Sequence, residues 1–363
     1  MKIAHITSVH KQNDNRIFYK ECTTLSNQGY DVTLIVAGAK SKKINGITVV
    51  GYPKSKGRIK RIFKTSIFDM IKVCKKVDAN IYHFHDPELI FTGLYLKLVG
   101  KKVIYDIHEN NPASILSKPY IKSKLKRKVL AKVFDLFETL AVKIFDGIVT
   151  ARPDITKRFE HKNIITLRNF PILPDFTKSN NIRITKTKPS VIYVGGMHSL
   201  RGTYELIEAF KELDEYELWL LGFAIEEKLQ EKIETGCKNV KYFGLVEAYE
   251  VFNYINMADI GIITFLEEPN HVNTLATKPF EYMACGKPMI MSDFPYWRET
   301  FKNGSLYVDP SNPKKIANKV KELLKNKKLM QQMEKLNKKL SLDEYNWEKE
   351  SQKLIGLYKE LSL

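Results

Sequence analysis

The sequence predicts an α/β protein built from two doubly wound domains with parallel sheets. Short apolar segments alternate with amphipathic segments along most of the chain, which is the pattern of βαβ units. Segments such as VTLIVA and IYHFH are apolar throughout, as expected of strands that helices cover on both faces. The alternation stops once and then restarts, and 363 residues exceed the usual size of one domain.

The first domain is expected to span residues 1–168. Its predicted helices are Arg16–Gln28, which ends before Gly29, then Pro87–Val99 and Lys124–Phe145. Its predicted strands are Lys2–Thr7, Asp31–Ala37, Ile81–Phe84, Lys102–Asp106 and Gly147–Ala151.

The second domain is expected to span residues 190–341, after a polar linker at 169–189 that contains three prolines. Its predicted strands are Ser190–Val194, Glu217–Leu221, Val240–Phe243, Ile260–Thr264 and Pro288–Met291. Its predicted helices are Gly202–Leu213, Ala224–Thr235, Ala248–Met257, Lys278–Ala284 and Pro313–Leu324.

The tail, residues 342–363, is expected to form an amphipathic helix from about Leu342 to Leu361. Its apolar side carries Trp347, Leu354, Ile355, Tyr358 and Leu361. This helix either closes the second domain or crosses back onto the first.

The formal charge of +18 implies contact with anions, which could be nucleic acid, an anionic membrane or phosphorylated small molecules. The competing interpretation is that lysine only serves as the solubilising residue. Two basic clusters with interspersed apolar residues could dock on anionic lipid, or could be solvated helix faces. The clusters are Lys54, Lys56, Arg58, Lys60, Arg61 and Lys64, and Lys118, Lys122, Lys124, Lys126, Arg127, Lys128 and Lys132.

The chain's cysteines and its hydropathy favour a cytoplasmic protein. Its four cysteines are scattered, so neither a zinc cluster nor a disulfide framework is indicated, and a reducing compartment fits. The N-terminus enters a strand directly and lacks the apolar segment of a signal peptide. No stretch is long and apolar enough to span a membrane.

Ligands of doubly wound sheets bind beyond the carboxyl ends of the strands, so polar residues at those positions are the first candidates. The loop Ser8–Arg16 carries His10, Asp14, Asn15 and Arg16, which could meet a substrate. It has no GxGxxG fingerprint. It could equally be a surface loop that Asp14 or Asn15 caps.

Two histidine–acid clusters end predicted strands, at His83–Asp86 and at Asp106–Glu109. His85 and His108 could bind a sugar hydroxyl or carry a proton, whereas His83 is expected to lie in the packing of the sheet. A metal site would require His85, Asp86, His108 and Glu109 to converge, and we favour the interpretation without a metal.

The segment Gly195–Gly202 (GGMHSLRG) joins a strand to a helix and predicts a diphosphate site. Gly195 and Gly196 allow close approach of the backbone, and the helix N-terminus offers free amides. Arg201 supplies a fixed charge with fork geometry.

The segment Asn273–Pro288 (NTLATKPFEYMACGKP) is the most informative stretch. A carboxylate on a short helix, Glu281, suits two ribose hydroxyls, and amides around Thr274 and Leu275 suit phosphate. Lys278 could also face the anion. The alternative is that Glu281 is an ordinary exposed glutamate.

Together these segments resemble the retaining glycosyltransferases of family four, also described as group 1. The resemblance covers most of the chain in order and spacing. It is carried by DNRIFYKE, HDPEL, YDIHE, YVGG with Arg201–Gly202, FEYMACGKP and Trp347. It implies the GT-B fold, in which two Rossmann-like domains face each other across a cleft and the C-terminal helix crosses back to the first domain.

The resemblance also implies an activity: transfer of a sugar from a nucleotide-diphosphate donor, with retention and without an obligatory metal or other cofactor. The second domain would hold the donor, and His108 would contact the donor sugar. The acceptor side of the first domain would include Asp14, Asn15, Arg16, His85, Asp86 and Glu109. The donor would be held by Gly195, Gly196, Asn273, Thr274, Leu275 and Glu281, with Arg201 and Lys278 as the cations.

The sequence departs from the family pattern at two positions. Asn273 stands where the family has the first glutamate of a pair, and Gly196 stands where it has an arginine near the diphosphate loop. Arg201 falls on a family lysine that contacts the diphosphate. Arg201, with Lys278, is therefore the expected neutraliser of the leaving group.

The expected pathway is bacterial surface polysaccharide synthesis, with UDP-sugar as the first expectation for the donor and GDP-sugar as the next. The acceptor would be a glycan or a lipid-linked sugar, and attachment to the inner face of the plasma membrane would be peripheral. A nucleotide-sugar epimerase and a non-catalytic nucleotide-sugar binding protein are the alternatives. Nucleic-acid binding is favoured by charge alone, and no recognition helix supports it.

Overall fold

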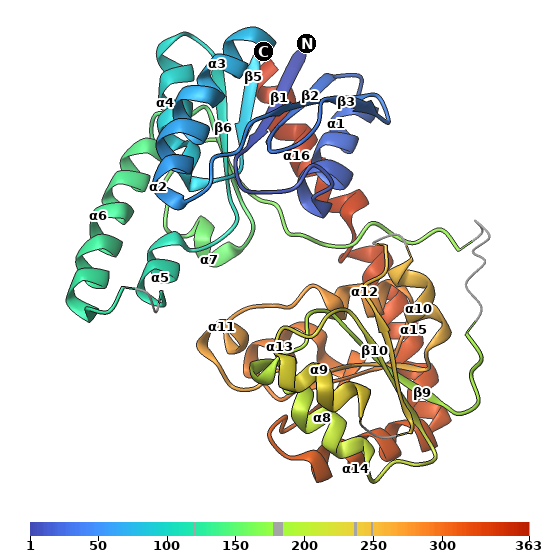
Figure 1. The fold of residues 1–363 in the computed structure, drawn as a ribbon. Helices are drawn as coiled ribbons and strands as arrows, with labels where there is room; N and C mark the ends of the chain where they lie inside the picture. The colour runs from blue at the N-terminus through green and yellow to red at the C-terminus, as the bar shows by residue number, and fades with distance from the viewer. Residues whose placement is uncertain (119–120, 177–183, 236–237, 248–249, 363) are drawn as a thin grey trace. The chain divides into compact units, whose positions relative to one another are not determined.

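The computed structural model describes residues 1–118, 121–176, 184–235, 238–247 and 250–362. It divides into two compact units, Met1–Asn169 with Glu348–Leu363, and Phe170–Trp347 (Figure 1). Part of the expected linker, Cys237 and the first two residues of the helix predicted from Ala248 lie outside the described residues.

The first unit contains an eight-stranded sheet with the order β3-β4-β2-β1-β5-β6-β7-β8. All neighbouring strands are parallel except the β3–β4 hairpin. The strands are β1 (Lys2–Thr7), β2 (Asp31–Ala37), β3 (Lys42–Ile44), β4 (Ile47–Tyr52), β5 (Ile81–Phe84), β6 (Lys102–Ile107), β7 (Gly147–Thr150) and β8 (Ile164–Thr166).

The connections of the first unit are mostly helical. They are η1 (Asn15–Cys22), α1 (Thr23–Asn27), α2 (Arg58–Lys60), η2 (Arg61–Asp69), α3 (Met70–Val77), η3 (Pro87–Leu89), α4 (Ile90–Leu98), α5 (Asn111–Leu116), α6 (Lys124–Val142) and α7 (Pro153–Thr156). Two of them, η1 and η2, are wound as π-helices.

Both faces of this sheet are covered, which explains the uniformly apolar strands. Ala4 and Ile6 of β1 point into a core with α3 and α4. His5, between them, points to the opposite face, where its ring lies near Tyr358 of the C-terminal helix α16 (Trp347–Ser362). Leu357 and Leu361 of α16 also reach Gly147 of β7. The tail therefore packs on the first sheet, as the crossing-helix prediction requires.

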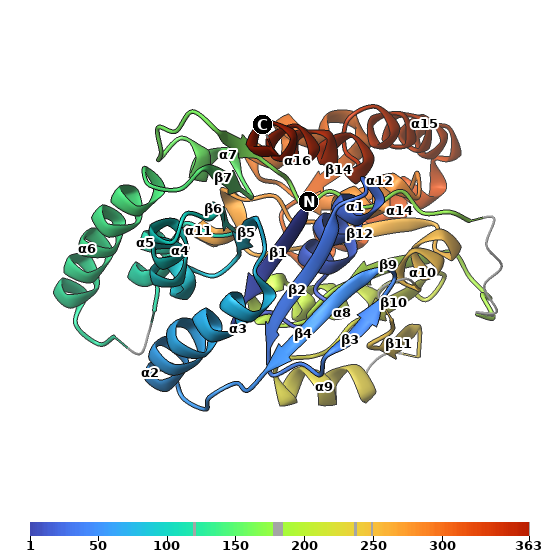
Figure 2. The same cartoon turned by 90° about the horizontal axis from the view of Figure 1, so that it is seen from above.

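The second unit contains a six-stranded parallel sheet with the order β11-β10-β9-β12-β13-β14. Its strands β9, β10 and β11 lie side by side in Figure 2. The strands are β9 (Ser190–Val194), β10 (Glu217–Leu221), β11 (Val240–Gly244), β12 (Ile260–Ile263), β13 (Met289–Ser292) and β14 (Ser305–Val308). The helices are η4 (Ser199–Arg201), α8 (Thr203–Phe210), α9 (Glu227–Glu234), α10 (Val251–Met257), α11 (Pro269–Val272), α12 (Lys278–Ala284), α13 (Pro295–Phe301), η5 (Lys302–Gly304), α14 (Pro313–Lys325) and α15 (Lys327–Asp343).

Alternation along β9 again separates two cores. Val191 and Tyr193 pack with α8 and α14, whereas Ile192 and Val194 pack with α12 and α13. The Tyr282 hydroxyl of α12 donates to the Ile192 carbonyl at 3.1 Å and accepts from the Val194 amide at 3.1 Å. These bonds fix α12 against the carboxyl end of β9.

Two features of the C-terminal half differ from the prediction. The tail helix begins at Trp347 rather than near Leu342, because a separate helix, α15, ends at Asp343 and the Leu340 carbonyl accepts the amides of Glu344 and Tyr345. Strand β14 and helix α15 were not predicted. The GT-B architecture, with two parallel α/β sheets and a C-terminal helix on the first, is confirmed.

Candidate functional site

The order of the first sheet reverses direction between β1 and β5, which is the switch point where doubly wound sheets bind ligands. The loops after these two strands carry His10, Asp14, His85 and Asp86, and Asp106 and His108 come from the end of β6 beside them. Most of the acceptor-side residues predicted from the sequence are therefore brought together.

Asp86 is a buried anchor for the loop after β1. Its Oδ2 accepts hydrogen bonds from the Thr7 hydroxyl at 2.8 Å and from the backbone amides of Ser8 at 2.6 Å and Val9 at 3.2 Å. A carboxylate satisfied in this way fixes the start of the loop, which brings His10 to 3.5 Å from Asp86 Oδ1.

Asp14 caps the π-helix η1, as one of the two sequence interpretations proposed. Its Oδ1 accepts the amides of Arg16 and Ile17, and its Oδ2 lies 3.0 Å from His10 Nδ1. Burial alone would lower the pKa of His10, but the carboxylates of Asp14, Asp86 and Asp106 together outweigh it and raise the pKa above its ordinary value. His10 and Asp14 are half-buried and together offer a polar pair at the surface.

Arg16 and Asp106 form a buried bidentate ion pair at the centre of the site. Arg16 Nε and Nη2 donate to the two oxygens of Asp106, each at 3.0 Å, and Nη1 donates to the Leu167 carbonyl at 2.8 Å. Burial by itself would raise the pKa of Asp106, but the Arg16 guanidinium and His108 hold it well below its usual range. Arg16 is thus a structural cation inside the unit.

Asp106 also orients two histidines. Its Oδ2 lies 2.8 Å from His108 Nε2 and 3.2 Å from His85 Nδ1. His85 is fully buried, which lowers its pKa to about 4. His108 is half-buried, and in the tautomer in which its Nε2–H donates to Asp106 its Nδ1 is left as an acceptor.

The other predicted acceptor-side residues, Asn15 and Glu109, are exposed. The metal alternative from the sequence required His85, Asp86, His108 and Glu109 to converge. Within the described residues they do not: His85 and His108 meet at Asp106, while Asp86 faces the loop after β1. His83 lies in the packing, as predicted, and bonds the Tyr358 hydroxyl at 3.0 Å.

In the second unit the order of strands reverses between β9 and β12. The glycine loop follows β9, and Gly195 has a backbone φ of +138°, which favours glycine. An added Cβ at Gly196 would lie 3.3 Å from Arg201 Nη1. At Gly202, with φ of +64°, it would lie 1.9 Å from the Thr264 carbonyl oxygen. The three glycines allow Arg201 and the end of β12 to approach the loop.

Arg201 is held from two sides. Its Nη1 donates to the Gly196 carbonyl at 2.8 Å, which also accepts from the Tyr193 hydroxyl, and the guanidinium lies 5.2 Å from the centroid of the Phe265 ring. Its Nε is buried and has no hydrogen-bond partner among the described residues. A cation with such fixed orientation is suited to an anionic ligand.

The loop between α11 and α12 lies at the same edge of the sheet. Trp297 Nε1 donates to the Thr274 carbonyl at 2.7 Å, and the Trp297 ring packs near Phe265, the residue under Arg201. Asn273 is exposed, whereas Thr274, Leu275, Lys278 and Glu281 are half-buried. The Lys278 ammonium lies 2.8 and 2.7 Å from the two oxygens of Glu281.

The second unit carries a family match. Residues 188–326 match the family described as glycosyl transferases group 1. The second unit therefore resembles the group 1, or family four, glycosyltransferases, and the chain as a whole has the GT-B fold.

The individual relatives are distant. An uncharacterized glycosyltransferase of Methanocaldococcus jannaschii is 26% identical over 178 residues, which are 47% of this chain and 48% of that protein. The chain thus spans about half the length of the curated relatives it matches.

Solved structures of the same fold align over almost the whole chain. Sucrose-phosphate synthase from Thermosynechococcus elongatus aligns with a TM-score of 0.75 at 15% identity, over 99% of this chain and 98% of the other. Anabaena HepE in complex with UDP-glucose aligns with a TM-score of 0.71 at 11% identity, over 100% and 99%.

Sequence reasoning missed four contributors to these sites: His5, Glu21, Phe265 and Trp297. The aromatic pair acts only through the packing of distant segments, so no local pattern marks it. His5 could have been noticed, because it is a histidine inside an apolar strand that pairs in register with His83.

Proposed function

We propose that this chain is a retaining glycosyltransferase that takes its sugar from a nucleotide-diphosphate donor bound by the second unit. The observation that carries the proposal is the arrangement around Arg201. An oriented guanidinium, a glycine loop and the loop before Glu281 meet at the switch point of the second sheet. UDP is the preferred nucleotide, because HepE has the same fold and its structure contains UDP-glucose.

In this proposal each group of the second unit has one task. Arg201 and the amides near Thr274 and Leu275 neutralise the charge that grows on the leaving diphosphate, so no obligatory metal is needed there. Glu281 accepts two ribose hydroxyls. Since Lys278 pairs with both oxygens of Glu281, we assign it the task of orienting that carboxylate as well as that of a nearby cation. Asn273, in place of the family glutamate, would contact the sugar as an amide.

The first unit supplies the acceptor side. We propose that His108 Nδ1 accepts a hydroxyl of the transferred sugar and that His10 with Asp14 faces the acceptor. The acceptor attacks the face from which the diphosphate leaves, and a diphosphate oxygen takes its proton, so configuration is retained. The buried Arg16, His85 and Asp86 act by positioning these groups. The acceptor would be a glycan or a lipid-linked sugar of bacterial surface polysaccharide synthesis.

A thermal-shift screen tests the donor site. UDP, GDP and their common sugar conjugates are each added in the presence of EDTA, and we expect one nucleotide to raise the melting temperature, because a ligand that binds the native state stabilises it. A chain that shows no shift with any nucleotide sugar would not support the proposal. Conversion of the donor without an acceptor would indicate an epimerase, and binding without transfer a non-catalytic binding protein.

The variant Glu281→Ala tests whether Glu281 binds the ribose of the nucleotide. Loss of hydrogen bonds to a charged carboxylate costs about 1.5–3 kcal/mol, so affinity for the selected nucleotide should fall roughly 10- to 150-fold by calorimetry. Glu322→Ala is the control, because Glu322 pairs with Lys319 on the exposed face of α14. Unchanged affinity in Glu281→Ala would show that the ribose does not bind Glu281.

We also propose that the first unit attaches to the inner face of the plasma membrane. None of the helices in the described part of the chain is long and apolar enough to cross a bilayer. Helix α6, however, exposes apolar side chains at helical spacing, and basic residues of the second cluster lie among them. The exposed apolar residues of α6 are Leu125, Val129, Leu130, Val133, Leu136 and Leu140. In the first basic cluster, Ile59 and Phe63 are also exposed.

Vesicle co-sedimentation measures this attachment. The chain should bind anionic vesicles at low salt and dissociate from them as the salt concentration rises. Each basic residue near an anionic surface contributes about 1 kcal/mol of attraction, and added salt screens this attraction by shortening the Debye length. The double variant Val129→Glu and Val133→Glu should bind several-fold more weakly, with Glu227→Gln, which is far along the chain, as control. Equal binding by neutral and anionic vesicles would contradict the charge argument.

A further inference from the structure

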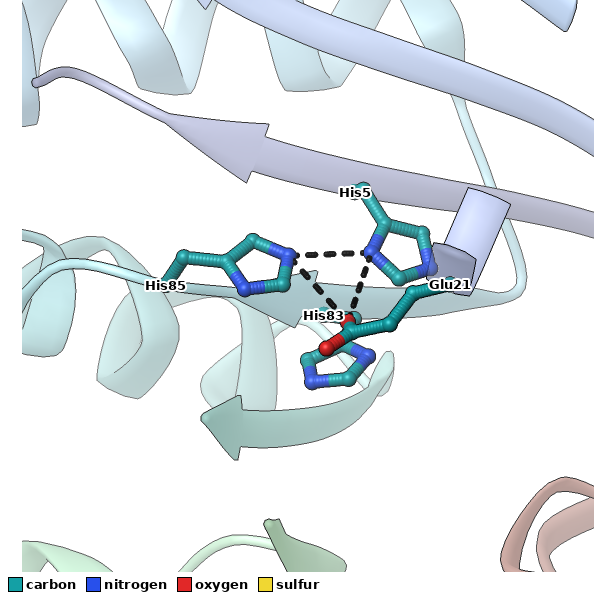
Figure 3. A group of neighbouring side chains, drawn as sticks. All are labelled: His5, Glu21, His83 and His85. Carbon is teal, nitrogen blue, oxygen red and sulfur yellow. Dashed lines mark hydrogen bonds and ion pairs between the residues drawn. The ribbon is translucent and has the colours of Figure 1, made fainter. Parts of the chain in front are cut away.

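Three histidines and a glutamate form a closed cluster inside the first unit, beneath the candidate acceptor side, which it adjoins through His85 and through Arg16. His5 comes from β1, His83 and His85 lie on and just after β5, and Glu21 comes from η1 (Figure 3). All four side chains are buried, and one ligand atom from each lies within 4.8 Å of the others. Neither oxygen of Glu21 accepts a hydrogen bond from a described residue, although Oε1 lies 3.0 Å from Arg16 Nε.

The potential metal-ligand atoms of three of these side chains lie close enough together to bind one metal ion. His5 Nδ1 and His85 Nε2 share a hydrogen bond of 2.9 Å, whose proton a metal ion would displace, and Glu21 Oε2 lies 3.8 Å from the first nitrogen and 3.9 Å from the second (Figure 3). A triangle with sides of 2.9, 3.8 and 3.9 Å has a circumradius of about 2.1 Å, so one point is equidistant from the three atoms at the length of a zinc–nitrogen or zinc–oxygen bond.

The opposite nitrogen of each imidazole already has a partner. His85 Nδ1 bonds Asp106, and His83 Nδ1 and His5 Nε2 both bond the Tyr358 hydroxyl, at 3.0 and 3.3 Å. His83 Nε2 is buried and has no hydrogen-bond partner among the described residues. Ligating histidines in metal sites are oriented in this way, with the outer nitrogen on a carboxylate or another fixed group.

We infer that His5, His83, His85 and Glu21 form a structural site for a divalent first-row transition metal, with zinc as the best fit. Three imidazoles and one carboxylate suit tetrahedral zinc. Four protein ligands and full burial leave no open position for a substrate. The metal would tie β1, β5 and η1 together and, through Tyr358, the C-terminal helix. This inference does not depend on the proposed transferase activity. The metal would have a structural role in the first unit and would not bind the diphosphate of the donor.

Metal content tests the inference. The full chain is purified without a tag or chelator and analysed by inductively coupled plasma mass spectrometry, and we expect about one zinc or related divalent ion per chain. Glu21→Gln and His83→Gln should each lower this content at least about tenfold, and Tyr358→Phe should weaken zinc in a chelator competition about 10- to 100-fold. The matched control is His161→Gln, whose imidazole bonds the Phe145 carbonyl instead.

A second measurement covers variants that fail to fold. The wild-type chain is unfolded with chelator and refolded with cobalt, which should give the visible absorption bands of a tetrahedral site. Less than about one tenth of an equivalent of any transition metal in wild-type chain, both as purified and after refolding in zinc, overturns the inference. Equal metal content in the wild-type chain and in folded Glu21→Gln also overturns it.

Discussion

Replacement of Arg201 by alanine should lower turnover about 10²- to 10³-fold, or about 2.7–4 kcal/mol in the activation free energy, with the chain still folded. Negative charge develops on the diphosphate as it leaves, and a cation that is already oriented stabilises that charge without reorganisation. The bond to the Gly196 carbonyl and the Phe265 ring provide this orientation. Initial rates with the nucleotide sugar selected by thermal shift give the comparison.

Two further variants define what the arginine contributes. Arg201→Lys keeps the charge but loses the planar fork, so its rate should lie between those of the wild type and the alanine variant. Arg298→Ala is the matched control, because Arg298 is an exposed arginine of the same unit that pairs with Asp293. Near-normal turnover in Arg201→Ala would show that another group neutralises the diphosphate.

The strands that the sequence predicted are those with continuous apolar runs, such as Ile81–Phe84 and Ser190–Val194, whose predicted bounds the structure matches. A strand that is buried on both faces is apolar throughout, so it can be recognised from its own sequence without knowing which strands pair with it. The hairpin of β3 and β4 was not predicted, because β3 is an edge strand with two lysines, and its identity depends on pairing with β4.

The positions of the site residues could be predicted, but their partners could not. Strand ends in an α/β sheet mark His85, Asp106 and Gly195 as candidates. The ion pair between Arg16 and Asp106 joins residues 90 positions apart, and no local pattern records it. Polar residues near a switch point can therefore be recognised from sequence, whereas those that face a ligand and those that hold the site together are distinguished only by burial.

Replacement of Arg16 by methionine should destabilise the first unit by about 3–5 kcal/mol, because it leaves a buried carboxylate without its cation. The loss should grow with pH. In the wild type the pKa of Asp106 is held below its unfolded value, so this carboxylate stabilises the fold above that unfolded value and less as pH falls. Without Arg16, burial raises the pKa of Asp106, and ionising it then opposes folding.

The measurement must report on the first unit, and tryptophan fluorescence does not, since all three tryptophans lie in Phe170–Trp347. Peptide-resolved hydrogen exchange at pH 5.5 and 8 follows β1, β5 and β6 directly. Arg152→Met is the control, because Arg152 makes a similar bidentate pair with Asp154 at the surface, where such pairs contribute about 0–1 kcal/mol. An equal, small effect of both variants would mean that Glu21, Asp106 and their neighbours tolerate the loss of the cation by taking up a proton, and the ion pair would then be dispensable for the fold.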